Sequence, residues 1–415
     1  MSSIKCVATH RKADIHKLKI SEALGHPMRA ANHLRIAIIG AGLGGVTCAI
    51  LFQRSGYHID VYEQAPVFTR LGAGIHLGPN CVRVFNHIGI GEKLLEFAVL
   101  PKAWNSLQWD SGECLFSLPL RDVAEQLYGA AYVTVHRGDM HALLIDAVAP
   151  GTIHFGKRLI DLDQDASSVR MLFADGSTGH ADIVVGADGV FSKVREWLFG
   201  PQEPIYTGYI GHRAFIPARN LGQLSFEDHA KWWAPDRHLI VYFLTNRRDE
   251  LYLVTGALEK WEKPISWSNS SMQELRAAFV GFHSECQRLI GGVEGEVTKW
   301  AFFERAPMPI WHRGRIVMIG DACHPMKPHM AQGAAIAIED AAMLLRCLKE
   351  TGNEFSAAFA LYEANRMPRA HKVQELSRYN TWLRDPCDPT WLYGYNVFTE
   401  PLVKAREPAR FLGVK

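Results

Sequence analysis

Residues 315–340 read RIVMIGDACHPMKPHMAQGAAIAIED, and this is the most informative part of the chain. An apolar strand is predicted over Ile316–Ile319, and it brings Asp321 to its carboxyl end. A loop rich in Pro and His follows, and a helix is expected to start near Gln332. This order aims one carboxylate and one helix N-terminus at a common ligand, because a helix start presents unpaired N–H groups and partial positive charge.

A second glycine-rich turn stands near the other end of the chain, where residues 40–45 read GAGLGG and fit the pattern G-x-G-x-x-G. An apolar run precedes this turn and a helical pattern follows it. Gly40 permits the tight turn, Gly42 lets the backbone approach a pyrophosphate, and Gly45 lets the helix pack closely. The turn therefore predicts a dinucleotide site at the start of a βαβ unit.

An acidic residue supports this interpretation. Glu63 directly follows the second predicted strand, residues 57–62. In dinucleotide-binding folds a carboxylate at this position binds the ribose hydroxyls. The chain has only one such glycine fingerprint, so separate Rossmann domains for FAD and NAD(P)H are not expected. The distant Asp321 segment favours FAD, because the ribityl and pyrophosphate parts of FAD need a second anchor.

Composition excludes several classes of protein. The chain has 415 residues, 48% hydrophobic, and a net charge of +2 from 45 basic and 43 acidic residues, so nucleic acid is not an expected partner. No apolar run approaches the roughly 20 residues that span a bilayer. The eight scattered cysteines indicate free thiols and a cytoplasmic location. Cys323 is interpreted as a packed small residue rather than a nucleophile, and no metal site is expected.

The predicted fold is α/β, with a doubly wound, Rossmann-like FAD-binding domain, an inserted and mostly antiparallel β-sheet domain, and C-terminal helices. Single helices are expected over residues 80–97 and 271–289, and one strand over 153–162. The expected divisions are a disordered extension, the first part of the FAD domain, the substrate-binding sheet, the second part of the FAD domain and a tail: 1–33, 34–200, 201–305, 306–380 and 381–415.

Three motifs in order carry a resemblance to a known family. They are the 40–45 turn, Gly186-Ala187-Asp188-Gly189, and Gly320-Asp321-Ala322-x-His324-Pro325. Together they resemble the single-component flavoprotein aromatic hydroxylases, the para-hydroxybenzoate hydroxylase-like family. The similarity covers nearly the whole chain from residue 34. It implies bound FAD, transient NADH or NADPH, and O2 as co-substrate.

The resemblance also implies roles for matched residues. Arg137 should reach the FAD pyrophosphate or ribityl region, Asp188 should support FAD and NAD(P)H binding, and Asp321 and Pro325 should line the flavin. The full expected cofactor set is Gly40, Gly42, Leu43, Gly45, Glu63, Gln64, Arg137, Asp188, Asp321, Pro325, Gly333 and Ala334.

The substrate pocket is expected at an inserted strand on which His238, Ile240 and Tyr242 alternate and so share one face. By resemblance, His76 and His329 also line this pocket. The predicted catalytic residues are His238, His76, Tyr242 and His329, and the predicted pocket residues are His76, His212, His229, Ile240, Tyr242 and His329. Ile240 and His229 depart from the Met and Cys usual in bacterial relatives.

The reaction that the resemblance implies is NAD(P)H- and O2-dependent hydroxylation of a hydroxylated aromatic or N-heteroaromatic acid, with 6-hydroxynicotinate and loss of its carboxylate favoured. His238 is the first choice for the base that removes the ring-hydroxyl proton. A salicylate-type substrate or another hydroxy-heterocycle is the alternative. A flavin oxidase or dehydrogenase, or a redox-sensing flavoprotein without catalysis, are alternatives of another class. Both monomer and homodimer remain open.

Overall fold

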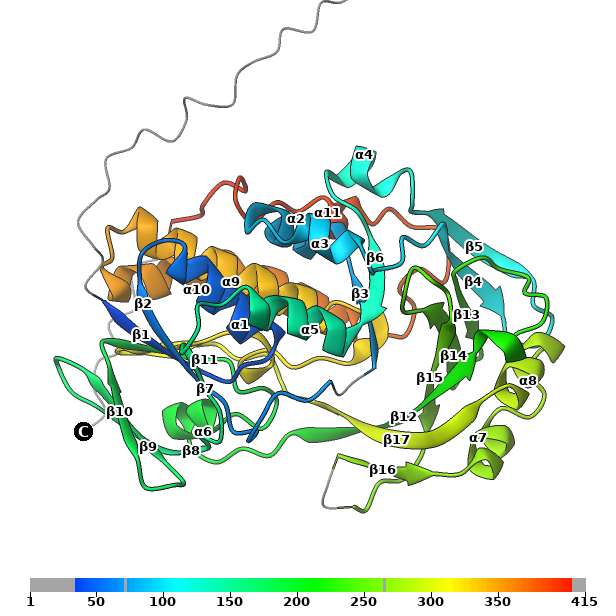
Figure 1. The fold of residues 1–415 in the computed structure, drawn as a ribbon, viewed down its shortest axis with the longest axis horizontal. Helices are drawn as coiled ribbons and strands as arrows, with labels where there is room; N and C mark the ends of the chain where they lie inside the picture. The colour runs from blue at the N-terminus through cyan, green and yellow to red at the C-terminus, as the bar shows by residue number, and fades with distance from the viewer. Residues whose placement is uncertain (1–33, 71–72, 264–265, 405–415) are drawn as a thin grey trace, which may run out of the picture.

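The computed structural model describes residues 34–70, 73–263 and 266–404. The N-terminal extension predicted for residues 1–33 lies outside them. Two large sheets organise these residues (Figure 1), one parallel and one mostly antiparallel. Within the described ranges, no helix combines the length and apolar character that crossing a membrane requires.

The first sheet is parallel except at one edge, where β18 pairs antiparallel with β19. Its order is β18 (His312–Arg313), β19 (Ile316–Met318), β11 (Ile183–Gly186), β1 (Arg35–Ile39), β2 (His58–Tyr62) and β7 (Ile153–His154). The central strands β19, β11 and β1 are apolar and almost wholly buried, as expected for a parallel sheet covered on both sides, whereas β2, β7 and β18 carry polar residues that are partly or fully exposed. The doubly wound FAD-domain architecture expected from the sequence is confirmed.

Helices cover one face of this sheet, and a small antiparallel sheet with α6 lies on the other (Figure 1). The small sheet contains β8 (Leu159–Gln164), β9 (Val169–Phe173) and β10 (Thr178–Ala181). The helices of this half are α1 (Leu43–Gln53), α2 (Pro79–His87), α3 (Gly91–Leu95), α4 (Ala124–Tyr128), α5 (Arg137–Asp146), α6 (Lys193–Phe199), α9 (Gly333–Glu350), α10 (Phe355–Leu376) and α11 (Thr390–Tyr393).

The second sheet has eight strands, in the order β16 (Trp267–Ser270), β17 (Glu294–Glu304), β12 (Ile205–Pro217), β15 (Glu250–Leu258), β14 (His238–Phe243), β13 (His229–Trp233), β4 (Ala103–Gln108) and β5 (Cys114–Pro119). Its outer face packs on α7 (Met272–Ala278) and α8 (Ser284–Gly291) in a separate apolar core. Its inner face turns toward the first sheet. A two-stranded ribbon, β3 (Gly74–Leu77) with β6 (Val133–His136), connects the two halves.

Glycines explain three differences from the sequence expectations. The helix predicted over 80–97 is broken at Gly89 (φ +64°), and that over 271–289 at Gly281 (φ +85°). The strand predicted over 153–162 is broken at Gly156 (φ +72°), which sends its two halves to different sheets. L-residues with side chains avoid these backbone angles, so each glycine ends its element.

The eight-stranded sheet also extends beyond the predicted range 201–305. Its strands β4 and β5 come from residues 103–119, and β4 pairs in parallel with β13 through Lys231 and Ser106. Strand β13 was not predicted, because polar residues at 229 and 231 interrupt its apolar pattern. Short 3₁₀ turns complete the description: η1 (Ala218–Asn220), η2 (Gly320–Ala322) and η3 (Pro328–Met330).

Candidate functional site

The glycine-rich turn lies where β1 passes into α1. Gly40 adopts φ +102°, and a Cβ there would stand 2.5 Å from the carbonyl oxygen of Ala187. A Cβ on Gly45 would overlap the carbonyl oxygen of Gly40. At Gly42, by contrast, a Cβ would meet no described atom within 4 Å. The turn is thus tightly packed at Gly40 and Gly45 and leaves space for a ligand at Gly42. On this open side lie the first N–H groups of α1, which have no acceptors within the helix.

Glu63 holds this turn from the end of β2. Its Oε2 accepts from the Ala41 N–H and its Oε1 from the Ala65 N–H, both at 2.8 Å. The neighbouring Gln64 is exposed. A carboxylate fixed at this position, beside the open side of the turn, fits the ribose-binding role predicted for it.

Arg137 is a cation without a counter-ion. It begins α5, is half-buried, and its guanidinium makes no ion pair or hydrogen bond with any residue of the described ranges. Burial and the nearby Arg213 lower the pKa of Arg137, while Asp321 opposes this. A buried cation without an anion is costly, so the environment of Arg137 fits a phosphate group of a bound dinucleotide.

Asp188 follows β11 and lies against Gly40, but its oxygens are used locally. Oδ1 accepts from the Ser192 hydroxyl at 2.5 Å, and Oδ2 accepts from the N–H groups of Lys193 and Val194. Burial raises the pKa of Asp188, and these bonds oppose the rise. The carboxylate therefore caps α6, and its predicted role toward FAD and NAD(P)H remains a prediction.

Asp321 stands after β19, where its side chain is exposed although protein surrounds it. Burial raises the pKa of Asp321, while His324 and Arg137 lower it. The carboxylate is therefore accessible to a ligand while the surrounding protein partly desolvates it. Gly333 begins α9 nearby, and a Cβ there would meet no described atom within 4 Å, so the helix start is also open.

One small residue joins the two glycine motifs. A Cβ on Gly44 would lie 3.0 Å from the Cβ of Ala337, and a Cβ on Gly320 would lie 2.9 Å from the same atom. Helix α9 thus packs between the first turn and the Asp321 loop. The N-termini of α1 and α9 and the Asp321 loop therefore lie side by side, and we call this region the corner. The sequence predicted such an arrangement for a cofactor held at both ends.

A buried ionic network supports this corner from behind. Asp340 accepts from the Gly320 N–H at 3.0 Å, contacts Nε2 of His324 at 2.5 Å, and pairs with Arg366. Cys323 joins His324 and Asp340 as a group with metal-ligand chemistry. Arg366 already neutralises Asp340, however, and burial raises the pKa of Cys323, which keeps it a thiol. This geometry fits a structural role for Cys323.

All of the predicted substrate residues except His212 form two neighbouring groups against the inner face of the eight-stranded sheet. His76, His229 and Tyr242 pack together, with ring centroids 4.1 Å apart for His76 and Tyr242 and 5.3 Å apart for His76 and His229. His238 and His329 form the second group, with centroids 5.6 Å apart. Between them, across β13 and β14, Ile240 lies opposite Lys231. We call these seven residues the histidine cluster.

Four members of the histidine cluster are neutral near pH 7. Burial and the charge of Lys231 lower the pKa of His76 and of His329 to about 3. The same causes hold the pKa values of His229 and His238 well below their usual value. Burial raises the pKa of Tyr242 well above its usual value. No acidic residue is among the causes of these shifts, so the cluster suits an anionic ligand.

Two features of the cluster were missed by the sequence reasoning. Lys231 was overlooked because a lysine in an unrecognised strand reads as a surface residue. Tyr132, which contacts Nδ1 of His76 through its hydroxyl at 2.9 Å, lies outside every motif. His212, in contrast, lies apart from the cluster. Its backbone N–H and its ring both contact Thr255. Side chains alternate along a strand, so His212 and its neighbour Arg213 point to opposite faces of the sheet.

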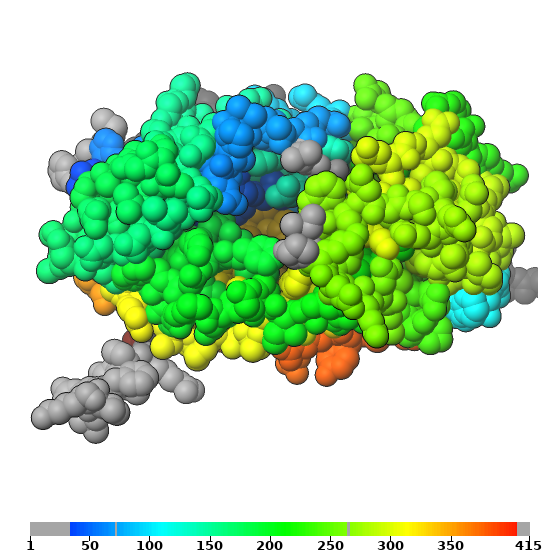
Figure 2. Space-filling view, turned by 90° about the horizontal axis from the view of Figure 1, so that it is seen from below, coloured from blue at the N-terminus to red at the C-terminus, as the bar shows by residue number. Residues whose placement is uncertain are grey.

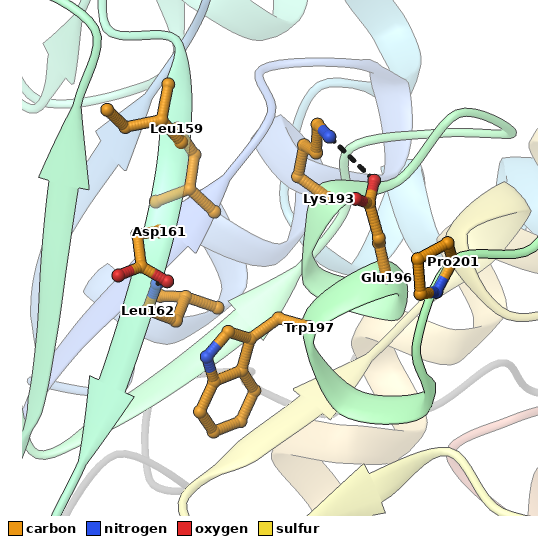
Figure 3. Close-up of a pocket in the computed structure, with 8 residues that line it drawn as sticks. Leu159, Asp161, Leu162, Lys193, Glu196, Trp197 and Pro201 are labelled. Carbon is orange, nitrogen blue, oxygen red and sulfur yellow. Dashed lines mark hydrogen bonds and ion pairs between the residues drawn. The ribbon is translucent and has the colours of Figure 1, made fainter.

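The molecule is hollowed between its two halves (Figure 2). The interior shows the dark blue of the α1 turn, the teal of the β6–α5 connection and the ochre of the α9 region. A separate surface cavity of about 170 Å³ lies between β8 and α6, beside the Lys193–Glu196 pair (Figure 3). It contains no predicted site residue, so it has no place in the candidate site.

The chain is similar in sequence to proteins of a known family. Residues 33–377 match the FAD binding domain family. The chain is 52% identical to 6-hydroxynicotinate 3-monooxygenase of Pseudomonas fluorescens and 53% identical to the enzyme of the same name from Bordetella bronchiseptica. Each alignment covers 90% of this chain and 98% of the relative. A 3-amino-4-hydroxybenzoate 2-monooxygenase of Streptomyces cremeus is 33% identical, over 87% of this chain and 95% of the relative.

Solved structures share the fold. Klebsiella pneumoniae HpxO complexed with FAD and uric acid has a TM-score of 0.76 at 24% identity, covering 84% of this chain and 88% of that one. A salicylate hydroxylase substrate complex has a TM-score of 0.75 at 23% identity, covering 89% and 97%.

Proposed function

The chain belongs to the FAD binding domain family and is a flavin-dependent monooxygenase, and from this premise we propose that it converts 6-hydroxynicotinate to 2,5-dihydroxypyridine. The observation that carries the proposal is the identity of 52–53% to two proteins named 6-hydroxynicotinate 3-monooxygenase, over nearly their whole length. The histidine cluster supports it, because a buried lysine with a lowered pKa, beside neutral imidazoles and without an acidic partner, would regain its charge against an anionic, polar ring.

The residues of the corner fit FAD. The N–H groups at the start of α1 and the free cation of Arg137 would hold the pyrophosphate, and Glu63 would hold the adenosine ribose. Asp321 would accept from the ribityl hydroxyls, and the positive end of α9 would face the flavin ring. When bound, FAD supplies hydride acceptance from NAD(P)H and activation of O2.

The proposed reaction has a balanced outcome. Substrate, NAD(P)H and O2 are consumed with two protons. One oxygen atom enters the ring at the carbon that carried the carboxylate, and the other leaves as water, together with CO2 and oxidised nicotinamide. The ring hydroxyl is para to that carbon. Removing its proton pushes electron density to the position that is hydroxylated.

The chain's contribution is to bind, orient and dehydrate the ring. The cluster residues are almost entirely enclosed: His76 is 7% exposed, His238 4% and His329 4%. Because their pKa values are lowered, these histidines are neutral at pH 7, and each offers one N–H donor and one nitrogen lone pair to a ligand. Enclosure also keeps bulk water away from the reacting ring, which favours productive transfer of oxygen over its loss as peroxide.

The test uses the purified protein reconstituted with FAD. We expect the visible spectrum of a bound flavin, substrate-stimulated NADH or NADPH oxidation with 6-hydroxynicotinate, and one atom of label from ¹⁸O₂ in 2,5-dihydroxypyridine. Coupled turnover of salicylate but not of 6-hydroxynicotinate would refute the proposed substrate. Oxidation of NAD(P)H without label in any product would refute the proposed oxygen insertion.

A further inference from the structure

One lysine is buried inside the histidine cluster without an acidic partner. Lys231 is 0% exposed, and desolvation lowers its pKa well below the usual value. Its Nζ donates to Oδ1 of Asn380 at 2.9 Å and lies 3.4 Å from the ring centroid of Trp233. In this structure the amide oxygen of Asn380 faces Lys231, and an amide oxygen can only accept, so the lysine donates an N–H to it.

Asn380 also contacts His238 through the other end of its amide. It lies beyond the end of α10, and its Nδ2 stands 2.9 Å from Nδ1 of His238. Because the amide oxygen faces Lys231, the amide nitrogen faces the imidazole and donates to it. Nδ1 of His238 is therefore a hydrogen-bond acceptor, and it carries no proton.

The tautomer of His238 follows from this bond. Burial, Lys231 and His329 hold the pKa of His238 well below its usual value, so the ring is neutral. With Nδ1 accepting, the single proton sits on Nε2, which has no hydrogen-bond partner in the described ranges. The ring packs closely against β15 because its neighbour there is Gly256: a Cβ at that position would stand 2.2 Å from Cε1 of His238. His238 thus offers an N–H donor.

His329 has the opposite tautomer. Its Nδ1 lies 3.0 Å from the backbone oxygen of Ser377, and a carbonyl can only accept, so Nδ1 carries the proton. The other nitrogen, Nε2, keeps its lone pair, is enclosed, and has no partner among the described residues. The rings of His238 and His329 stand at 83° to one another. A donor and an acceptor therefore stand on neighbouring rings.

We propose that His238 and His329 form a donor–acceptor pair that recognises a ring nitrogen together with the oxygen on the adjacent ring carbon. Asn380, Lys231 and Ser377 are positioning residues that set the two tautomers. This inference rests on the proposed function and deepens it, because it names the substrate class: heteroaromatic acids with a hydroxyl group beside the ring nitrogen.

Both forms of such a ring match the pair. In the hydroxypyridine form, the O–H donates to Nε2 of His329 and the ring nitrogen accepts from Nε2 of His238. In the pyridone form, the ring N–H donates to His329 and the carbonyl oxygen accepts from His238. The carbocyclic analogue 4-hydroxybenzoate lacks the ring nitrogen and leaves one buried group unmatched. His238 then serves as a donor, and not as the base expected from the sequence.

The tautomers can be measured in the wild-type protein. We expect ¹⁵N NMR of histidine-labelled, FAD-loaded enzyme at pH 7 to show Nε2 of His238 and Nδ1 of His329 protonated, with His238→Gln and His329→Gln spectra giving the assignments. A proton on Nδ1 of His238, or on Nε2 of His329, overturns the inference. The NMR measurement needs no turnover, so its result does not depend on the proposed function.

A single substitution tests whether the two tautomers determine substrate recognition. In Asn380→Asp, both carboxylate oxygens accept, so the proton of His238 should move to Nδ1 and leave two acceptors in the pocket. We expect kcat/KM for 6-hydroxynicotinate to fall on the order of tenfold to a hundredfold, and its preference over 4-hydroxybenzoate, measured as binding to the flavoprotein, to shrink. Asn269→Asp, on the exposed strand β16, adds the same charge and should change neither.

The outcomes separate the two proposals. Wild-type enzyme that does not hydroxylate 6-hydroxynicotinate refutes the proposed function while the tautomer measurement still decides this inference. Wild-type enzyme that hydroxylates it, with Asn380→Asp keeping the full preference over 4-hydroxybenzoate, overturns the donor–acceptor pair alone.

Discussion

Arg366 of α10 reaches Asp340 of α9 through its Nε at 2.8 Å, and both side chains are 0% exposed. The same guanidinium pairs with Glu339 through Nη1 at 2.7 Å. Two buried acids thus share Arg366, and Glu339 has Arg369 as a second cationic partner. Because Asp340 also accepts from the Gly320 N–H, this pair fixes the loop that carries Asp321.

Replacing this cation should damage both stability and the corner. In Arg366→Met, Asp340 loses its buried counter-charge, and we expect a loss of about 3–5 kcal/mol in the free energy of unfolding. Weaker FAD binding should accompany it. Thermal unfolding and FAD titration measure the two effects. Arg35→Gln removes an exposed ion pair with Asp182 and should cost about 0–1 kcal/mol; equal losses in the two variants would contradict a special role for Arg366.

Gly42 separates ligand binding from folding. A Cβ there meets no described atom, so Gly42→Ala should leave the melting temperature of the FAD-free protein within a few degrees of wild type. The same methyl group would stand where the pyrophosphate approaches, and FAD affinity should fall at least tenfold. Gly291→Ala in α8 also meets nothing nearby and should bind FAD normally. Undiminished affinity in Gly42→Ala would argue against the pyrophosphate position.

Arg137 should matter to the cofactor and not to the fold. Its guanidinium has no anionic partner in the described ranges, so Arg137→Met relieves an unpaired charge and should not destabilise the FAD-free protein. FAD affinity should fall about tenfold to a hundredfold, the worth of a charge-assisted hydrogen bond of about 1.5–3 kcal/mol. Arg137→Lys should recover part of the affinity. Flavin fluorescence titration distinguishes these outcomes from a purely structural role.

The buried histidines predict sensitivity to acid. The folded-state pKa of His329 is about 3, below the unfolded value near 6.5. The unfolded chain therefore binds the extra proton first, and stability present above pH 6.5 is lost as pH falls toward 3. In that window His329 contributes a slope of about 1.4 kcal/mol per pH unit. Urea unfolding of His329→Gln at several pH values should show a shallower slope; an unchanged slope would contradict the burial of a neutral ring.

The same shifts bear on activity. Since the pKa values of His76 and His329 lie near 3, neither should titrate between pH 5 and 8 in the free enzyme. We expect the kcat/KM profile for 6-hydroxynicotinate to lack an acid limb from these groups above pH 5. A limb near pH 6.5 that disappears in His76→Gln would show that His76 is more exposed to water than this structure has it.

Sequence patterns predicted the parts of this fold that local chemistry controls. The two glycine turns, the strands that precede them and the helices α1 and α9 could be read because turn geometry and apolar runs are local. The breaks at Gly89, Gly156 and Gly281 were missed, since a glycine with positive φ looks the same in sequence as one inside a helix.

The site was predictable where residues stand in motifs and not where they meet through tertiary packing. His238, Ile240 and Tyr242 were found from alternation, and the structure puts them on one face with His229. Asn380 was not found, because it lies 142 residues from His238 and in no regular element. Lys231 was passed over because burial of an unpaired lysine runs against its usual preference, and only the strand pairing reveals it.

The pairing of β4 with β13 bears on how the protein can be divided. A fragment limited to residues 201–305 would carry β13 as a bare edge, with its N–H and C=O groups open to any extended chain. Such a fragment should self-associate. Transplanting the ring-binding sheet between homologues therefore requires residues 103–119 to travel with it, even though they are encoded far upstream.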